Sequence, residues 1–218
     1  MMDDSLFPKS VCWCYVRTDP EILDLSNFYN LHPLEQSLVS QATDQRKAEF
    51  GDARWCAHRA LEDLGKEHGD PILRGHRGMP LWPDTVCGSI THTGGFRAAA
   101  VAPQLFVRSL GIDVEPAEPL PDGVLSGIAR AGEYRQLDSL RKQGIACADR
   151  LLFCAKEATY KTWFPLTHRW LGFEQAEIDL REDGTFISYL LVRPTPVPFI
   201  NGRWSISEGY ILATAFIH

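Results

Sequence analysis

Two acidic residues alternate with apolar ones in the segment Gly111-Ile112-Asp113-Val114-Glu115. Successive side chains of a β-strand point to opposite faces, so Asp113 and Glu115 would share one face while Ile112 and Val114 fill the core. Neighbouring carboxylates raise each other's pKa unless a cation lies near them, and ligands that are all oxygen atoms suit Mg²⁺ or Mn²⁺. The segment therefore predicts a divalent-cation site. The alternative is a solvated strand end with the two charges held apart.

A second group of reactive side chains lies in the segment from Phe153 to Lys161, where Glu157 and Lys161 are four residues apart. On a helix this spacing places them on one face, and it is also the spacing of an ordinary surface ion pair. The surrounding helix is rich in large apolar side chains, which favours a buried setting. In that setting Glu157 would add a third carboxylate to the cation site, and Lys161 would contact a phosphate.

Basic residues gather in two earlier segments. A helix over about residues 45–64 would place Arg46 in the middle of its apolar side and Arg54 at the edge of that side. An arginine directed inward must meet an anion or a carboxylate, or extend its head group to the surface. The turn-rich segment 70–84 carries Arg74, His76 and Arg77 beside two glycines. Both segments suit phosphate binding, and both also suit a structural ion pair or a solvated loop.

An α+β fold would position these residues. Strands are predicted over residues 11–16, 89–93, 96–101 and 107–114, the last three forming a meander that turns first at Gly94-Gly95. Helices are predicted after Pro33, from Asp44 as N-cap to Gly65, and from Asp149 as N-cap to a stop at Pro165. The tail reads as strands over 176–180, 186–192 and 210–217. Helix followed by meander thus occurs twice, which predicts two similar halves, residues 1–108 and 109–218.

Composition excludes several classes of protein. The 218 residues are 44% hydrophobic and 23% charged, which is typical of a globular chain rather than a disordered one. Lys and Arg total 22 against 28 Asp and Glu, and a net charge of −6 argues against a nucleic-acid partner. No apolar stretch is long enough to span a membrane, and the start Met1-Met2-Asp3-Asp4 is acidic where a secretory signal would be basic. Six cysteines without a CxxC motif are too few for a disulfide scaffold, so we expect a cytoplasmic protein.

Five segments in this order resemble a 4'-phosphopantetheinyl transferase of the monomeric Sfp-like type. They are residues 46–64, 78–83, 89–93, 111–115 and 153–161. The sequence from Phe153 through Trp170-Leu171-Gly172-Phe173-Glu174 is similar to the actinobacterial PptT branch of that family. The resemblance implies an α+β fold of two pseudo-symmetric halves, each a helix packed on an antiparallel meander. It also implies transfer of phosphopantetheine from coenzyme A to a serine of an acyl or peptidyl carrier protein, with release of 3',5'-ADP.

The resemblance implies a role for each candidate residue. Asp113, Glu115 and Glu157 would hold Mg²⁺, or Mn²⁺, and Glu157 or a water would take the serine proton. Lys161 would contact the pyrophosphate, and Lys156 would lie near it. The first half would supply the remaining coenzyme A contacts: Arg46, Arg54, Arg74, Thr91 and His92 for the phosphates, and Met79 and Pro80 beside the adenine. The second half would carry the metal ligands and the catalytic helix.

Charge supports this reading, since coenzyme A carries about four negative charges and a chain of net charge −6 must gather cations locally to bind it. Met79 stands where many relatives have lysine and Thr91 where many have serine, and Arg77 could replace the lost cation. Aromatic residues near Trp163 and Trp170 would serve carrier docking or core packing, and Cys12 and Cys14 would be buried small residues or a soft-metal pair. A magnesium-dependent pyrophosphate hydrolase and a non-catalytic coenzyme A module are the other functions considered. The carrier, whether from fatty acid, polyketide, peptide or siderophore assembly, is left open by the sequence.

Overall fold

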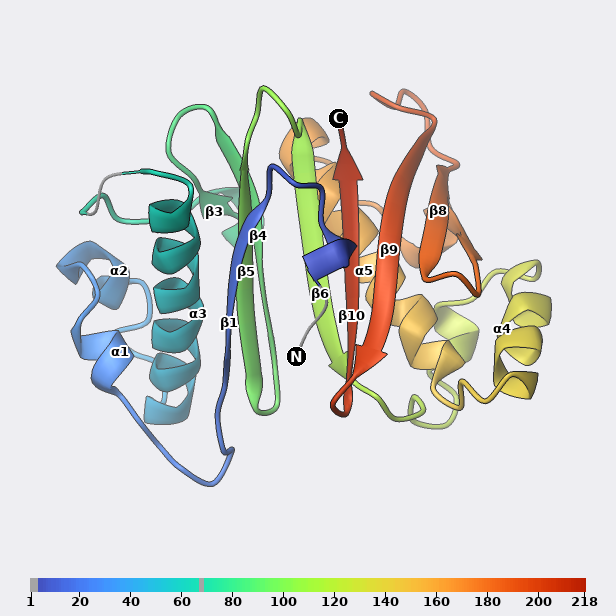
Figure 1. The fold of residues 1–218 in the computed structure, drawn as a ribbon, viewed down its shortest axis with the longest axis horizontal. Helices are drawn as coiled ribbons and strands as arrows, with labels where there is room; N and C mark the ends of the chain where they lie inside the picture. Colours follow the sequence, from blue (N-terminus) through green and yellow to red (C-terminus); the bar gives the residue numbers. More distant parts are fainter. Residues whose placement is uncertain (1–3, 67–68) are drawn as a thin grey trace. The chain divides into compact units, whose positions relative to one another are not determined.

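A computed structural model describes residues 4–66 and 69–218, so the acidic start Met1–Asp3 lies outside the described residues. The described chain divides into two compact units (Figure 1). We call residues 9–110 the N-unit, and residues 4–8 together with 111–218 the C-unit. Residues 4–8 belong with the second half of the chain, where the Thr214 hydroxyl donates to the Leu6 carbonyl at 2.9 Å.

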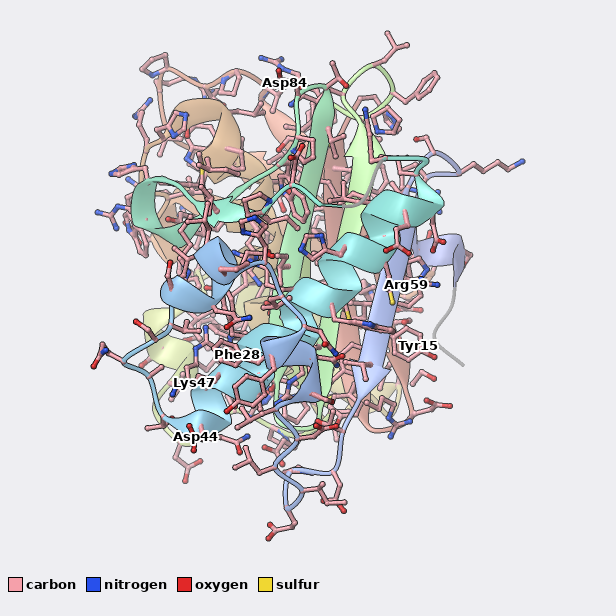
Figure 2. The ribbon with its side chains drawn as sticks, turned by 90° about the vertical axis from the view of Figure 1, so that its left-hand side faces the viewer. Tyr15, Phe28, Asp44, Lys47, Arg59 and Asp84 are labelled. Carbon is pink, nitrogen blue, oxygen red and sulfur yellow. The ribbon has the colours of Figure 1, made fainter. Side chains whose placement is uncertain are left out.

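A three-stranded antiparallel sheet in the order β1-β5-β4 forms the N-unit, with one long helix packed on it (Figures 1 and 2). The strands are β1 (Cys12–Arg17), β4 (Val86–Thr93) and β5 (Phe96–Pro103). Helix α3 (Asp44–Asp63) covers β1 and β5, while the short helices α1 (Ser26–Tyr29) and α2 (Pro33–Ser37) precede it. The hairpin of β2 (Leu73–Arg74) and β3 (Pro80–Leu81) encloses the 3-10 turn η2 (His76–Gly78). Helix and sheet enclose a small core that includes Ala57, Leu61 and Val101.

The predicted helix over residues 45–64 is confirmed, but its N-cap is Thr43 rather than Asp44. The Thr43 hydroxyl accepts the Arg46 amide at 3.3 Å, which satisfies one of the first free N–H groups of the helix. The predicted hairpin of β4 and β5 is also present, with Thr93 opposite Phe96 across the Gly94-Gly95 turn.

The meander predicted for residues 89–114 is wrong in its third strand. Strand β6 (Ser109–Pro116) does not continue the β4-β5 hairpin but pairs with β10 in a different sheet. The place beside β5 is taken by β1, which pairs with β5 from Cys12 to Arg17. Strands β5 and β6, which are consecutive in sequence, therefore do not pair, because β1 occupies the edge of β5 that β4 leaves open.

A five-stranded sheet in the order β6-β10-β9-β8-β7 forms the C-unit. Its other strands are β7 (Ala176–Leu180), β8 (Thr185–Leu190), β9 (Phe199–Ser207) and β10 (Tyr210–Ile217). The helices are α4 (Glu133–Lys142) and α5 (Ala148–Thr167), with 3-10 turns η1 (Asp4–Leu6), η3 (Leu125–Gly127) and η4 (Phe173–Gln175). Helix α5 packs on β10, and the apolar sides of sheet and helices form one core.

Both predicted ends of α5 are corrected. Cys147 rather than Asp149 is the N-cap, and Pro165 lies within the last turn instead of ending the helix. A proline has the φ angle of a helix, but it removes one N–H donor and crowds the carbonyl four residues earlier, and α5 continues only two residues beyond it, to Thr167. The helix ends at His168, which is left-handed and donates its N–H to the Phe164 carbonyl at 2.8 Å.

Gly111 at the start of the Asp113 segment allows β6 to lie directly against α5. A Cβ atom at this position would collide with the Ala158 carbonyl and the Thr162 hydroxyl of α5. The strand that carries Asp113 and Glu115 is therefore held close to the helix that carries Glu157. Among the described helices, none is both long enough and apolar enough to cross a lipid bilayer.

Candidate functional site

Strand β6 and helix α5 bring the predicted acidic residues into one part of the C-unit. Ile112 and Val114 are fully buried, as the alternating pattern predicts, and Asp113 between them is only 5% exposed. Asp113 accepts a hydrogen bond from the Lys161 ammonium at 2.7 Å, and the same ammonium donates to the Ile112 carbonyl at 3.1 Å. Lys161 therefore joins the helix to the strand at the first carboxylate.

Arg150, in the first turn of α5, holds the second carboxylate. Its guanidinium donates to Glu115 at 3.1 Å and to the carbonyls of Glu118 and Pro119 at 2.8 and 2.9 Å. Burial raises the pKa of Glu115, and the nearby Asp113 raises it further, while Arg150 and Lys161 lower it. Glu115 is thus a half-buried carboxylate that is stabilised by one arginine and repelled by another acid.

Glu157 completes the acidic group. Burial raises its pKa, the carboxylates of Asp113 and Glu115 add to that rise, and Lys161 opposes it. The three acids interact electrostatically, and a divalent cation would relieve their repulsion. Their donors are all oxygen atoms, which suits Mg²⁺.

The same side chains do not form an assembled metal centre. Among the described residues, no three His, Cys, Asp or Glu side chains are grouped closely enough to hold an ion. Lys161 and Arg150 instead pair with Asp113 and Glu115. The donor chemistry fits a divalent cation, and the ligand set stays a prediction.

The N-unit brings together the basic side chains predicted to contact phosphate. On α3, the Arg46 guanidinium contacts Glu49 at 3.2 Å and lies 3.0 Å from Nε2 of His92 on β4. One turn further along, the Phe50 ring packs against two other guanidinium groups, with Arg54 at 4.8 Å and Arg74 at 5.1 Å from the ring centroid. The structure thus brings together all four of the predicted arginine and histidine phosphate contacts.

These arginines repel one another. Burial lowers the pKa of Arg54 to about 10, Arg74 and Arg46 contribute to the decrease, and Glu35 opposes it. Burial also lowers the pKa of Arg74, as does Arg46. Arginine remains charged at neutral pH. An anion among these side chains would remove part of the repulsion.

The chain matches known families along both units. A model of the 4'-phosphopantetheinyl transferase N-terminal domain matches residues 34–102, and one of the 4'-phosphopantetheinyl transferase superfamily matches residues 109–215. The chain is 45% identical over 206 residues to the 4'-phosphopantetheinyl transferase Npt of Nocardia iowensis, covering 88% of this chain and 91% of Npt. The chain belongs to the 4'-phosphopantetheinyl transferase family.

Two other relatives extend the match. The transferase is 43% identical over 190 residues to the 4'-phosphopantetheinyl transferase PptT of Mycobacterium tuberculosis, covering 83% of each chain. It is 46% identical over 191 residues to the 4'-phosphopantetheinyl transferase Svp of Streptomyces mobaraensis, covering 84% of this chain and 76% of Svp. These matches confirm the resemblance to the PptT branch and the prediction of an enzyme that transfers a group. The α+β fold predicted from the sequence is confirmed as well.

Lys156 of the transferase does not have the environment predicted for it. It is 3% exposed, and its ammonium donates to the carbonyls of Ile128, Phe173 and Ala176 at 2.8 to 3.1 Å. It also pairs with the fully buried Glu133 at 2.9 Å. Because its three N–H donors are used inside the protein, the phosphate contact predicted for Lys156 is not supported. The residue ties α5 to α4 and β7 instead.

Thr91 is also apart from the arginines. Strand β4 directs His92 toward Arg46, and neighbouring side chains on a strand point to opposite faces. Thr91 is therefore on the other face, where it is 3% exposed. Met79 and Pro80 follow η2, where the Met79 carbonyl accepts the Gly75 amide at 2.8 Å and Pro80 lies opposite Arg74. Arg77, the suggested replacement for a lysine, is exposed and left-handed, with φ of 54°.

The aromatic residues after Tyr160 divide between core and surface. Trp163 and Phe164 are buried, and the Trp163 indole donates to the Arg169 carbonyl at 3.0 Å. Trp170 is 59% exposed and packs on Tyr160 with 5.1 Å between ring centroids. Core packing thus accounts for the first two, and carrier docking stays a prediction for the exposed side of Trp170. Cys12 and Cys14 pack against the N-unit core, but they are partly rather than fully buried.

Sequence reasoning missed three residues that support the predicted site: Arg150, Glu49 and Glu35. Arg150 had a usable signal, because it precedes Glu157 by two helical turns and so shares its face of the helix. Glu49 follows Arg46 by three residues, the spacing of a helical ion pair. Glu35 had none, since a single acid in a five-residue helix carries no periodic pattern.

Proposed function

We propose that this transferase moves 4'-phosphopantetheine from coenzyme A to a serine hydroxyl of an acyl or peptidyl carrier protein, converting the apo carrier to the holo form. The observation that carries the proposal is the acidic group of the C-unit. Glu157, a carboxylate with a raised pKa, lies on the helix that also positions Lys161 against Asp113. A carboxylate of that kind is suited to accept a proton near neutral pH.

The cations of the N-unit support coenzyme A as the donor. Arg46, Arg54, Arg74 and His92 offer several N–H donors within one small region. Guanidinium groups bind phosphate oxygens through paired, charge-assisted hydrogen bonds. We assign to these residues the phosphates of coenzyme A, whose charge would offset the repulsion among the arginines.

The reaction follows from the residues of the C-unit. Glu157 takes the proton of the carrier serine as the serine oxygen bonds to the phosphorus that bears phosphopantetheine. The bond from that phosphorus to the bridging oxygen breaks, and 3',5'-ADP leaves with the electron pair. Lys161 stabilises the charge that develops on the phosphate oxygens. Asp113, Glu115 and Glu157 would hold Mg²⁺, which neutralises pyrophosphate charge when it is bound.

The test is the intact mass of a panel of apo carriers after incubation with the enzyme, coenzyme A and Mg²⁺. The expected result is a gain equal to one phosphopantetheine on at least one carrier, and none when its acceptor serine is replaced by alanine. Breakdown of coenzyme A with every carrier unmodified would instead identify a hydrolase. Binding of coenzyme A without turnover would identify a non-catalytic module.

A further inference from the structure

Glu35 is a fully buried carboxylate on α2 that the mechanism above does not use. Its two oxygens accept hydrogen bonds from Nε2 of His58 at 2.9 and 3.1 Å, and one oxygen accepts the Ile72 amide at 3.2 Å. The Arg54 Nε atom lies 3.6 Å from the same carboxylate. One acid thus contacts α3 at two places and the chain that leads into β2.

Arg54 depends on this carboxylate for its charge balance. The residue is 5% exposed, and its Nε atom has no hydrogen-bond partner among residues 4–66 and 69–218. Arg46 and Arg74 both disfavour its positive charge, whereas Glu35 favours it. A buried cation without an opposing charge is strongly unfavourable. The charge of Glu35 therefore offsets part of the cost of burying the Arg54 guanidinium.

The Ile72 contact extends this influence to a second arginine. Ile72 directly precedes β2, which ends at Arg74. The hydrogen bond from the Ile72 amide fixes the chain two residues before Arg74, whose guanidinium packs on the same Phe50 ring as Arg54. Glu35 therefore contacts one arginine that packs on this ring and fixes the chain that leads to the other.

We infer that Glu35 is a positioning residue for phosphate binding, holding Arg54 and Arg74 in the arrangement that receives the phosphates of coenzyme A. The inference rests on the function proposed above, because it assumes that these arginines bind that substrate. Glu35 itself touches no substrate. Its contribution should appear in nucleotide affinity rather than in the rate of the chemical step.

A double-mutant cycle on the full chain separates positioning from a general structural role. The readout is the affinity for 3',5'-ADP measured by calorimetry, with thermal unfolding as a check on folding. Glu35→Gln should weaken affinity about tenfold, since Arg54 loses the buried negative charge that opposes its own. In an Arg54→Ala background the same substitution should have a much smaller effect, because Glu35 then has no Arg54 to position.

Two further variants sharpen the cycle. His58→Gln is the matched control, because it alters another partner of Glu35 and leaves Arg54 paired, and it should keep the parental affinity. Glu35→Asp keeps the charge but withdraws it by one methylene, so it should give an intermediate loss. It also serves if Glu35→Gln does not fold. At saturating coenzyme A, kcat should change by less than about twofold in each folded Glu35 variant.

Several outcomes would overturn the inference. One is a folded Glu35→Gln protein that binds 3',5'-ADP with the parental affinity. If only Glu35→Asp folds, parental affinity in that variant has the same meaning. An equal loss in the Arg54→Ala background would show that Glu35 does not act through Arg54, which contradicts the inference. If the parent transfers phosphopantetheine but the variants give one of these contrary results, the inference about Glu35 fails and the proposed function stands. If the parent binds neither 3',5'-ADP nor coenzyme A, the proposed function fails with it.

Discussion

The two units gather charges of opposite sign. The N-unit packs Arg54 and Arg74 on Phe50, with Arg46 close enough to repel both, whereas the C-unit brings Asp113, Glu115 and Glu157 together on β6 and α5. Burial and the neighbouring like charges lower the pKa of Arg54 and Arg74 in the N-unit and raise the pKa of Glu115 and Glu157 in the C-unit. Each cluster therefore has an unfavourable charge arrangement that a ligand of the opposite sign would relieve.

The charges that oppose each cluster are placed differently in the two units. In the N-unit the opposing acid Glu35 is fully buried, so the arginines are supported from inside the protein. In the C-unit the opposing cations Lys161 and Arg150 contact the carboxylates directly. A ligand of the N-unit adds to existing ion pairs, whereas a cation bound in the C-unit must compete with them. Experiments that remove one charge at a time should therefore affect the two units differently.

Removing divalent ions should have the largest effect. EDTA is expected to stop transfer to an apo carrier, because without the cation the three carboxylates repel the pyrophosphate. Added Mg²⁺ or Mn²⁺ should restore the activity. The measurement is the rate of holo-carrier formation by mass spectrometry. Activity that is indifferent to the chelator would remove the metal from the account and leave the C-unit acids without their proposed ligand.

Glu157→Gln should lower the rate of transfer by about 1,000-fold, since loss of a general base typically costs between a hundredfold and ten-thousandfold. Asp113→Ala should also abolish transfer. Coenzyme A should still bind both variants, more weakly in Asp113→Ala. Calorimetry with coenzyme A and single-turnover kinetics would check both statements. Full turnover in either variant would contradict the mechanism.

Two lysines of α5 offer a comparison within one helix. Lys156→Met should lower the free energy of unfolding by about 3 kcal/mol or more, because it leaves the buried Glu133 without its cation. Lys161→Met should reduce transfer with a much smaller effect on stability, because its side chain is partly exposed. Urea unfolding and steady-state rates of both variants test this. A stable but inactive Lys156→Met protein would instead indicate that Lys156 contacts the pyrophosphate.

Arg54→Ala should raise the KM for coenzyme A by about tenfold to a hundredfold, because it removes a charge-assisted phosphate contact. The value of kcat should change less, since Arg54 lies in the N-unit and takes no proton. Arg59→Ala is a matched control on the same helix, since Arg59 is exposed and pairs with Glu62. An effect on kcat alone would contradict the division of roles between the units.

The smallest effect concerns stability against pH. The pKa of Glu157 is raised in the folded protein, chiefly by burial and then by Asp113. The folded state therefore binds a proton more readily than the unfolded state, and this stabilising contribution is lost as pH rises through the folded pKa. Glu157→Gln should match the parent in stability below about pH 4 and gain on it toward neutral pH. A gain that does not depend on pH would contradict this cause.

Local patterns predicted much of the fold and of the candidate site. Alternation around Asp113 and the four-residue spacing of Glu157 and Lys161 identified side chains that the structure does bring together. Strand order was beyond such patterns, because it depends on pairing between segments far apart in sequence: β1 rather than β6 pairs with β5, and β6 pairs with β10. Glu35 was also beyond them, since its partners lie 19 to 37 residues away in sequence.

Lys156 is a motif residue that the structure places outside the predicted site. The family resemblance implied that Lys156 lies near the pyrophosphate together with Lys161, yet consecutive residues on a helix, such as Lys156 and Glu157, point in directions about 100° apart. Glu157 interacts electrostatically with Asp113 and Glu115 of β6, whereas Lys156 enters the core against Glu133. Adjacency in a motif therefore does not establish adjacency in a site.

The most direct test of the central claim is a crystal structure of the enzyme with coenzyme A and Mn²⁺, with the ion located by anomalous scattering. The account predicts one ion with oxygens of Asp113, Glu115 and Glu157 about 2.2 Å away, and with Lys161 moved from Asp113 toward the pyrophosphate. An ion bound elsewhere, with Lys161 still on Asp113 and Arg150 still on Glu115, would contradict it.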